Sequence, residues 1–302
     1  MLRTRVALPS CMRALLLVTL LLLVPVSIGR ADAALITDGV HSYLVKDGVL
    51  LGSRPGVFVG TSRGLTELSI GARTLPLYDC EVEPPTLLSE TVEAPTLVAI
   101  EEDGTTTELI AVSASGAREH ESNITIEAIL GSYVFASQYV WEDGCGAHGN
   151  SSRSLIVYDL EARASVDLAS DPRLTAWIAS LRGAAHDAYA AWGEFPIDDV
   201  HEDLIAFIPR LGGAAIPRVD AVFAAFTCYA CSDVGGDTMS DWGSYYSAAH
   251  VDAALPAFLR PAARATARAR RVYASDPSAT SMTGASALTE EVALRARASF
   301  TS

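Results

Sequence analysis

The chain has 302 residues, a formal net charge of −14 and a hydrophobic content of 50%. This length suits one large domain or two small ones, and the hydrophobic share is sufficient for a sizeable core. The acidic balance argues against a nucleic-acid partner, because phosphate backbones are bound by basic patches.

Residues 1–33 have the composition of a secretory signal peptide. Arginines precede an apolar run at 14–29, and Ala31-Asp32-Ala33 then supplies the small-x-small pattern that a signal peptidase accepts. Cleavage after Ala33 removes a net charge of +3 and leaves the mature chain at −17. The alternative is a retained membrane anchor, although a span needs about 20 apolar residues. The sequence therefore predicts a secreted or periplasmic protein with no stable membrane span after cleavage.

Residues 34–118 contain short apolar segments separated by turns, which predicts a β-rich region. Asp47-Gly48 and Asp103-Gly104 lie between β-forming residues and are typical hairpin turns. Residues 81–95 combine three prolines with four glutamates, so we expect an exposed connection there. Propeller-like hairpins are an alternative to an open sheet for this region.

The stretch EDGCGAHGNSS at 142–152 lies between two β-forming segments, which predicts the loop of a long β-hairpin. The second strand of this hairpin contains SLIVYDL at 154–160. Its middle is apolar at successive positions, so we expect that part to be buried on both faces.

Helical periodicity begins after Ser170-Asp171-Pro172, which combines a capping hydroxyl with an early proline. One apolar stripe then recurs at three- and four-residue steps up to Trp192. A second helix is expected from Asp198 or Asp199 to about residue 211, with Pro209 kinking or shortening it.

Two further strands are expected after these helices, in RVDAVFAAFTCYA and SYYSAAHV. Residues 119–262 are thus predicted to form an α+β domain in which a β-hairpin is followed by two helices and further strands. Residues 263–302 are expected to be a helical or disordered tail, with a short helix at 287–298.

Cys80, Cys145, Cys228 and Cys231 remain after cleavage, and an even count in an exported chain predicts two disulfides. Of the three possible pairings we favour Cys80–Cys145 with Cys228–Cys231. Redox pairs and half zinc sites also use the Cys-x-x-Cys spacing. A strand leads into this pair and no second ligand pair follows it, which favours a structural disulfide.

Candidate chemistry is sparse. His148 has the pKa range of a general acid or base, but a structural role in its glycine-rich loop is favoured over catalysis. Asp198, His201 and Glu202 would share one helical face and offer metal ligands, against the simpler interpretation of an acidic helix start. Asp233, Asp237 and Asp241 lack the order of an EF-hand loop. No cofactor motif is found, and no catalytic residue is assigned.

Gly146-Ala147-His148-Gly149-Asn150 is followed by Tyr158-Asp159-Leu160 and Val166-Asp167-Leu168. In this order the segments resemble the extracytoplasmic C-terminal domain of RsiV-type anti-sigma factors and of some peptidoglycan deacetylases, over about residues 123–260. Cys145 stands where that family has glycine. The resemblance implies an α+β domain of the cell envelope that works by binding, with His148 and Asn150 as candidate binding-loop residues.

These observations predict an exported, non-enzymatic binding protein whose ligand is a protein or a cell-wall component. Its acidic surface suits a cationic protein, and the family resemblance implies a lysozyme-type cationic protein in the anti-sigma case. A cell-wall glycan is the other candidate ligand. The alternatives are a metal-dependent hydrolase that uses His148 or residues 198–203, and a β-propeller-like lectin or scaffold.

Overall fold

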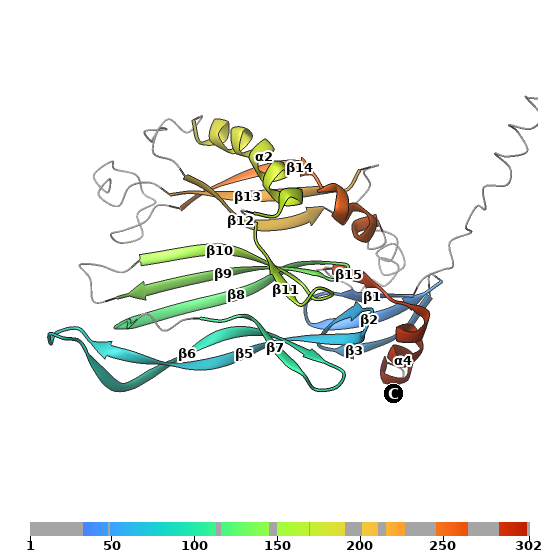
Figure 1. The fold of residues 1–302 in the computed structure, drawn as a ribbon, viewed down its shortest axis with the longest axis horizontal. Coiled ribbons are helices and arrows are strands. Elements are labelled where there is room, and N and C mark those ends of the chain that lie inside the picture. The colour runs from blue at the N-terminus through green and yellow to red at the C-terminus, as the bar shows by residue number, and fades with distance from the viewer. Residues whose placement is uncertain are drawn as a thin grey trace, which may run out of the picture. The chain divides into compact units, whose positions relative to one another are not determined.

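The computed structural model describes residues 33–47, 49–112, 116–144, 150–168, 170–190, 201–210, 216–226, 246–264 and 284–300. The described strands form three sheets (Figure 1). The eight-stranded sheet contains β1 (Ala34–Thr37), β2 (His41–Lys46), β3 (Val49–Pro55), β8 (Glu119–Leu130), β9 (Tyr133–Asp143), β10 (Asn150–Asp159), β11 (Ala164–Val166) and β15 (Gly284–Ala287). The four-stranded sheet contains β4 (Val57–Thr61), β5 (Gly64–Asp79), β6 (Thr86–Glu101) and β7 (Thr106–Ile110). The three-stranded sheet contains β12 (His201–Arg210), β13 (Arg218–Phe226) and β14 (Tyr246–Ala254). The helical elements include α2 (Pro172–Ala190), η2 (Ala257–Leu259) and α4 (Glu290–Phe300), and residues 260–264 are also helical. The predicted mixed α+β class is confirmed.

The predicted hairpins are present. β2 and β3 pair on either side of the turn at Asp47, whose φ of 52° is left-handed, and β6 and β7 pair around Gly104, whose φ is 83°. β9 and β10 pair in unbroken register from Tyr133–Asp159 to Glu142–Asn150, and residues 145–149 between them lie outside the described residues. The hairpin prediction for this stretch is therefore confirmed.

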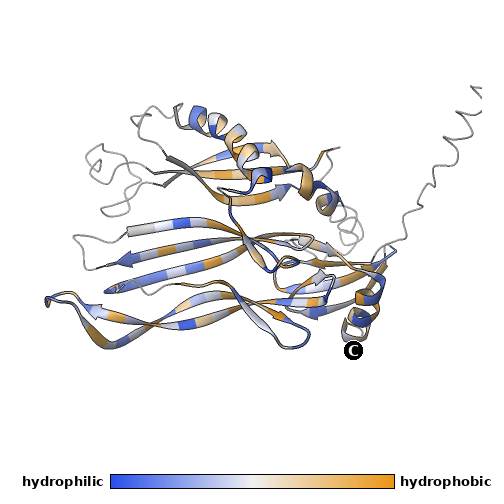
Figure 2. Ribbon diagram, viewed as in Figure 1, coloured by the Kyte–Doolittle hydropathy of each residue, from blue (hydrophilic) through white to orange (hydrophobic). Residues whose placement is uncertain are grey.

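Strand alternation on β10 builds two of the hydrophobic cores. Leu155 and Val157 belong to a core shared with α2 and the three-stranded sheet. Tyr158 belongs to a second core, shared with the four-stranded sheet, and Ile156 packs against it. The eight-stranded sheet therefore lies between two layers, and the prediction that this strand is buried on both faces is confirmed. Figure 2 shows that β12–β14 are mainly hydrophobic, whereas the outer ends of β8 and β9 are more hydrophilic.

The second predicted helix is wrong. Residues 201–210 form β12, which pairs antiparallel with β13 from His201–Phe226 to Arg210–Arg218. The apolar run there is buried on both sides, with Leu204 and Phe207 in one core and Ile205 in another. A short apolar run has no decisive period, and β12 is an edge strand, where Pro209 is tolerated.

The sequence predicts an exposed connection over 81–95, but the strand β6 already begins at Thr86. Its outer part pairs with β5, for example Leu87 with Tyr78, although both faces of that part are mostly exposed. The two long strands therefore extend past the core as a hairpin. The stacked layers also differ from the radial blades of a propeller.

The sequence predicts a loosely attached tail after residue 262, yet β15 lies between β1 and β8 within the eight-stranded sheet. It pairs parallel with β8 and antiparallel with β1. The helix expected at 287–298 is present as α4, whose Phe300 packs edge-on against Phe58 with ring centroids 5.7 Å apart. Residues 33–302 cluster as one compact unit, and the sheet crosses the boundary drawn at residue 118.

Candidate binding pocket

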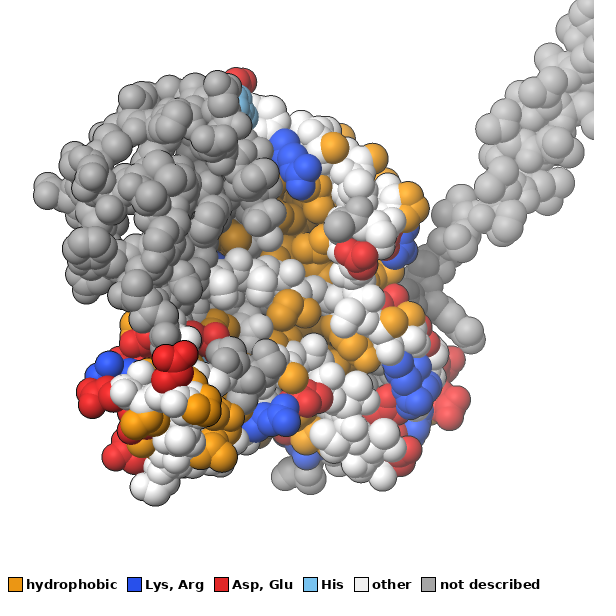
Figure 3. Space-filling model, turned by 60° about the vertical axis from the view of Figure 1, so that its left-hand side comes forward, with side chains coloured by type: hydrophobic (Ala, Val, Ile, Leu, Met, Phe, Trp, Pro, Cys, Tyr) orange, Lys and Arg blue, Asp and Glu red, His pale blue; other side chains and the backbone are white. Residues whose placement is uncertain are grey.

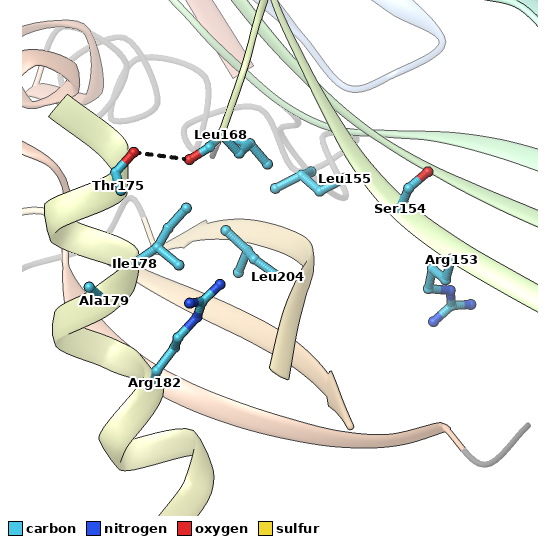
Figure 4. A pocket seen from close by; sticks show the side chains of 9 residues that line it. All are labelled: Arg153, Ser154, Leu155, Leu168, Thr175, Ile178, Ala179, Arg182 and Leu204. Carbon is cyan, nitrogen blue, oxygen red and sulfur yellow. Dashed lines mark hydrogen bonds between the residues drawn. The ribbon is translucent and has the colours of Figure 1, made fainter. Parts of the chain in front are cut away.

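A cavity of about 420 Å³ lies between α2, β10 and β12 (Figure 4). Its apolar lining consists of Leu155, Leu168, Ile178, Ala179 and Leu204. Its polar lining consists of Arg153, Ser154, Thr175 and Arg182. The volume lies within the range of sites for small molecules, which combine apolar walls with a few polar groups.

The start of α2 is fixed by a cap. Asp171 accepts a hydrogen bond from the backbone nitrogen of Arg173 at 2.8 Å, and Pro172 occupies the first helical position. The capping group is thus the carboxylate of Asp171, whereas Ser170 donates to Asp167 instead. Arg173 also forms an ion pair with Asp171, and this hydrogen-bonded guanidinium lowers the pKa of the Asp171 carboxyl.

The helix is held against the three-stranded sheet. The indole nitrogen of Trp177 donates to the carbonyl of Ala254 on β14 at 2.9 Å, and its ring lies 5.8 Å from that of Phe207. Phe207 in turn stacks on Phe135 of β9 at a centroid distance of 4.3 Å. One chain of aromatic contacts therefore connects the helix, the three-stranded sheet and the eight-stranded sheet around the cavity.

The helical wall of the pocket follows from helical spacing. Thr175, Ile178, Ala179 and Arg182 recur at three- and four-residue intervals, which places them on one face of α2. Thr175 donates a hydrogen bond to Asp171 at 2.8 Å, and its hydroxyl lies 3.4 Å from the carbonyl of Leu168. In Figure 4 this contact connects the helix to the segment that precedes it.

The opposite wall follows from strand spacing. Arg153 and Leu155 are two residues apart on β10 and therefore point to the same face of the sheet, toward α2. Leu155 and Ile178 are each 7% exposed and Leu204 is 9% exposed, so the apolar floor is almost buried. Arg153 and Arg182 are exposed at its edge.

Among the described residues, the two arginines differ from Arg163 and Arg218 in their contacts. Within the described ranges, neither Arg153 nor Arg182 forms a hydrogen bond or an ion pair. Elsewhere Arg163 binds Glu101 and Arg218 binds Asp252. Figure 4 shows Arg182 extending from α2 toward Leu204, with Arg153 on β10 at the other side. The pocket is thus a basic spot on an acidic protein.

The predicted site residues are only partly described. Cys145, His148, Cys228 and Cys231 lie outside the described residues. Asn150 is the first residue of β10 and pairs with Glu142. Cys80 is disulfide-bonded, and the second cysteine of that bond lies outside the described residues. The favoured pairing with Cys145 therefore stays a prediction, as does a binding role of His148 and Asn150.

The metal hypothesis for residues 198–203 has lost its geometric basis. His201, Glu202 and Asp203 lie on a strand, so the helical spacing that would gather them with Asp198 is absent. Asp198 and Asp199 themselves lie outside the described residues, as do residues 227–245 with their aspartates. Among the residues that the structure describes, no group of three histidine, cysteine or acidic side chains is arranged to hold a metal ion.

Sequence reasoning missed Arg153 and Arg182. Arg182 follows Ile178 by four residues on the stripe that was identified as apolar, and Arg153 precedes Leu155 by two residues on a strand whose middle is buried. The signal that identifies both residues is a charged side chain at a position whose helical or strand spacing places it on the same face as buried apolar residues. The sequence alone does not show that the two faces meet.

Comparison with known proteins gives few matches. No protein-family model and no curated protein matches the chain. A solved structure of a DUF3298 family protein from Pseudomonas aeruginosa is similar over 63% of this chain and 89% of its own, with 12% identity and a TM-score of 0.31. That domain is also found in RsiV-type anti-sigma factors, the family that the sequence resembles.

Proposed function

We propose that this protein is an exported, non-enzymatic binding protein of the cell envelope or extracellular space, with a cell-wall component or a protein as its ligand. The observation that carries the proposal is the pocket between α2, β10 and β12. The leader-like composition of residues 1–33 is the basis for export.

The chemistry of the pocket favours binding over catalysis. Its polar lining residues are two arginines, a serine and a threonine. Arginine stays protonated and therefore does not exchange protons with a substrate. The hydroxyl of Thr175 is already hydrogen-bonded to backbone. These groups can orient and hold a ligand, whereas acid–base chemistry requires a group that titrates near the working pH.

The rest of the surface suits a second kind of ligand. Figure 3 shows acidic side chains at the lower left and lower right of the molecule, where basic side chains also lie, and hydrophobic side chains across the middle. A net charge of −14, or −17 without residues 1–33, attracts cationic proteins at low ionic strength, and this attraction weakens as salt screens it.

The test is a binding assay with the purified exported protein. It is mixed at low salt with insoluble wall fragments and, separately, with a cationic lysozyme-type protein. We expect saturable binding to at least one of them, and binding to the cationic protein should fall at 0.5 M salt, where the Debye length is only a few ångströms. Absence of binding to both would remove this proposal.

The same samples test the enzymatic alternative. Metal content and release of soluble wall fragments are measured in parallel with binding. Bound wall material that remains intact is the expected outcome. Soluble products together with a stoichiometric metal ion would instead support a metal-dependent hydrolase.

A further inference from the structure

We propose that the pocket binds a carboxylate with an apolar tail, held by Arg153 and Arg182 over a floor of leucine and isoleucine. This deepens the proposed function and depends on it for its biological role. The ligand class follows from the two arginines, the floor and the rigidity of the walls.

The two guanidinium groups set the charge of the ligand. They come from separate elements, β10 and α2, and line one cavity without a hydrogen-bond or ion-pair partner in the described parts of the chain. A planar guanidinium presents several N–H donors in a geometry that fits a carboxylate, often through two parallel hydrogen bonds. Both side chains stay protonated, so each adds a permanent positive charge to the lining of the cavity.

The floor sets the other half of the ligand. Leu155, Ile178 and Leu204 are each less than one-tenth exposed, and their remaining surface faces the cavity. An apolar group of a ligand that binds there would bury the remaining exposed surface of these three side chains together with its own apolar surface, which is favourable. A small and strongly hydrated anion has no apolar part to bury against these side chains. We therefore expect inorganic phosphate to bind more weakly than a carboxylate with an apolar tail.

The walls are held before a ligand arrives. Trp177 ties α2 to β14, and the stacked rings of Phe135 and Phe207 join the two sheets beneath the floor. Leu155 and Leu204 each belong to the core that contains these rings. A preformed site avoids part of the ordering cost of binding, so we expect affinity for small probes that supply little contact area.

Two natural sources share this chemistry: the C-terminal carboxylate of a peptide with an apolar last residue, and a short fatty acid. N-acetylleucine represents the first and hexanoate the second. Two further probes are controls for hexanoate. Hexylamine has the same apolar tail but a positive charge, and inorganic phosphate has a negative charge but no apolar tail.

Isothermal titration of the purified exported protein with these four probes tests the proposal. We expect saturable binding of N-acetylleucine or hexanoate, and at least tenfold weaker binding of hexylamine and of phosphate. The carboxylate with the higher affinity indicates whether the natural ligand is a peptide C-terminus or a short fatty acid. The proposal is overturned if neither carboxylate binds, or if hexylamine or phosphate binds as tightly as the better carboxylate.

Variants locate the binding. Arg153→Gln and Arg182→Gln should each weaken carboxylate binding at least tenfold, because each removes a charge-assisted contact. Both side chains are exposed, so we expect unchanged melting temperatures. Arg73→Gln is the matched control, since Arg73 is an exposed arginine on β5 in the four-stranded sheet, across the eight-stranded sheet from the pocket. Equal binding by all three variants would place the carboxylate elsewhere and overturn the assignment.

The result is separable from the test of the proposed function. If wall fragments and the cationic protein fail to bind while carboxylate binding still depends on Arg153 and Arg182, the pocket assignment stands and the proposed role falls. If wall or protein binding is found but carboxylates do not bind, the proposed role stands and the pocket assignment falls.

Discussion

Cys80 is the described member of a disulfide, and the backbone around it identifies its expected partner. The amide of Tyr78 donates to the carbonyl of Ala117 at 3.0 Å, and the amide of Arg118 donates to the carbonyl of Asp143 at 2.6 Å. Tyr78 lies two residues before Cys80, and Asp143 lies two residues before Cys145. Because Tyr78 and Asp143 are hydrogen-bonded to the adjacent residues Ala117 and Arg118, the two cysteines are expected to lie close together. We predict the bond Cys80–Cys145.

Peptide mapping under non-reducing conditions checks this bond by mass spectrometry. We expect a linked peptide pair that contains Cys80 and Cys145, and one peptide with an internal disulfide between Cys228 and Cys231. The first bond closes a loop of about 65 residues, so Cys80→Ser should lower stability by about 4 kcal/mol in the chain-entropy description. A link from Cys80 to either of the later cysteines would contradict the prediction.

Asp171 provides a residue-level test of how the helical wall of the pocket is held. Its pKa is lowered by the hydrogen bond from Arg173, so the charged carboxylate is favoured in the folded state. This stabilisation is present at neutral pH, above the ordinary value of 3.8, and is lost as pH falls through the lower pKa of the folded state.

We therefore predict that Asp171→Ala lowers stability by about 1 kcal/mol at pH 7, the usual cost of losing a cap. At a pH well below 3.8 the variant and the original protein should differ less. Thermal unfolding at both pH values measures this. A difference that is the same at both would show that the charged cap is not what holds the helix. Ser170→Ala is the control, since Ser170 is not the cap.

At the scale of elements, two glycines should respond to the same substitution in opposite directions. Gly284 of β15 faces Ile129 of β8, and an added Cβ would lie 2.6 Å from the backbone nitrogen of Ile129. Gly183 lies within α2, where an added Cβ meets nothing within 4 Å.

We expect Gly284→Ala to cost about 1–3 kcal/mol, because backbone atoms must separate to admit the methyl group. Gly183→Ala should instead add about 0.5–1 kcal/mol, since alanine favours the helix. Urea unfolding of both variants measures the two effects. A neutral Gly284→Ala would show that β15 is not held tightly against β8.

The elements show where sequence reasoning succeeds. The helix from Pro172 has a cap, a proline at its first position and a long apolar stripe, three local signals that agree. The hairpins at Asp47 and Gly104 follow from turn residues with left-handed backbone. These signals act over a few residues, so they are visible in the sequence without knowledge of the fold.

The failures share one cause. In 201–210 an apolar run fits either a helix or an edge strand, and only pairing with β13 decides between them. Residues 284–287 are four small residues whose place in the sheet depends on partners more than 150 residues earlier. The pocket could not be predicted for the same reason. Arg153 and Arg182 line one cavity only because α2 packs on the sheets.

For the whole molecule, β15 is the piece that joins the two halves of the eight-stranded sheet, β11–β8 and β1–β3. A chain that ends at residue 283 loses β15 and α4, which exposes the edges of β1 and β8. Unpaired edges promote association between chains. We expect this truncated chain to aggregate, whereas one that ends at residue 300 should remain monodisperse in size-exclusion chromatography. A monodisperse truncated chain would contradict this role of β15.

The position of β15 also has a consequence for the order in which the protein folds. β1 is the first strand of the described chain, and its neighbour β15 begins only at Gly284. Contacts this distant in sequence form late and slow the folding of a domain. The eight-stranded sheet can therefore be completed only when residues 284–287 are available, which is almost the whole polypeptide.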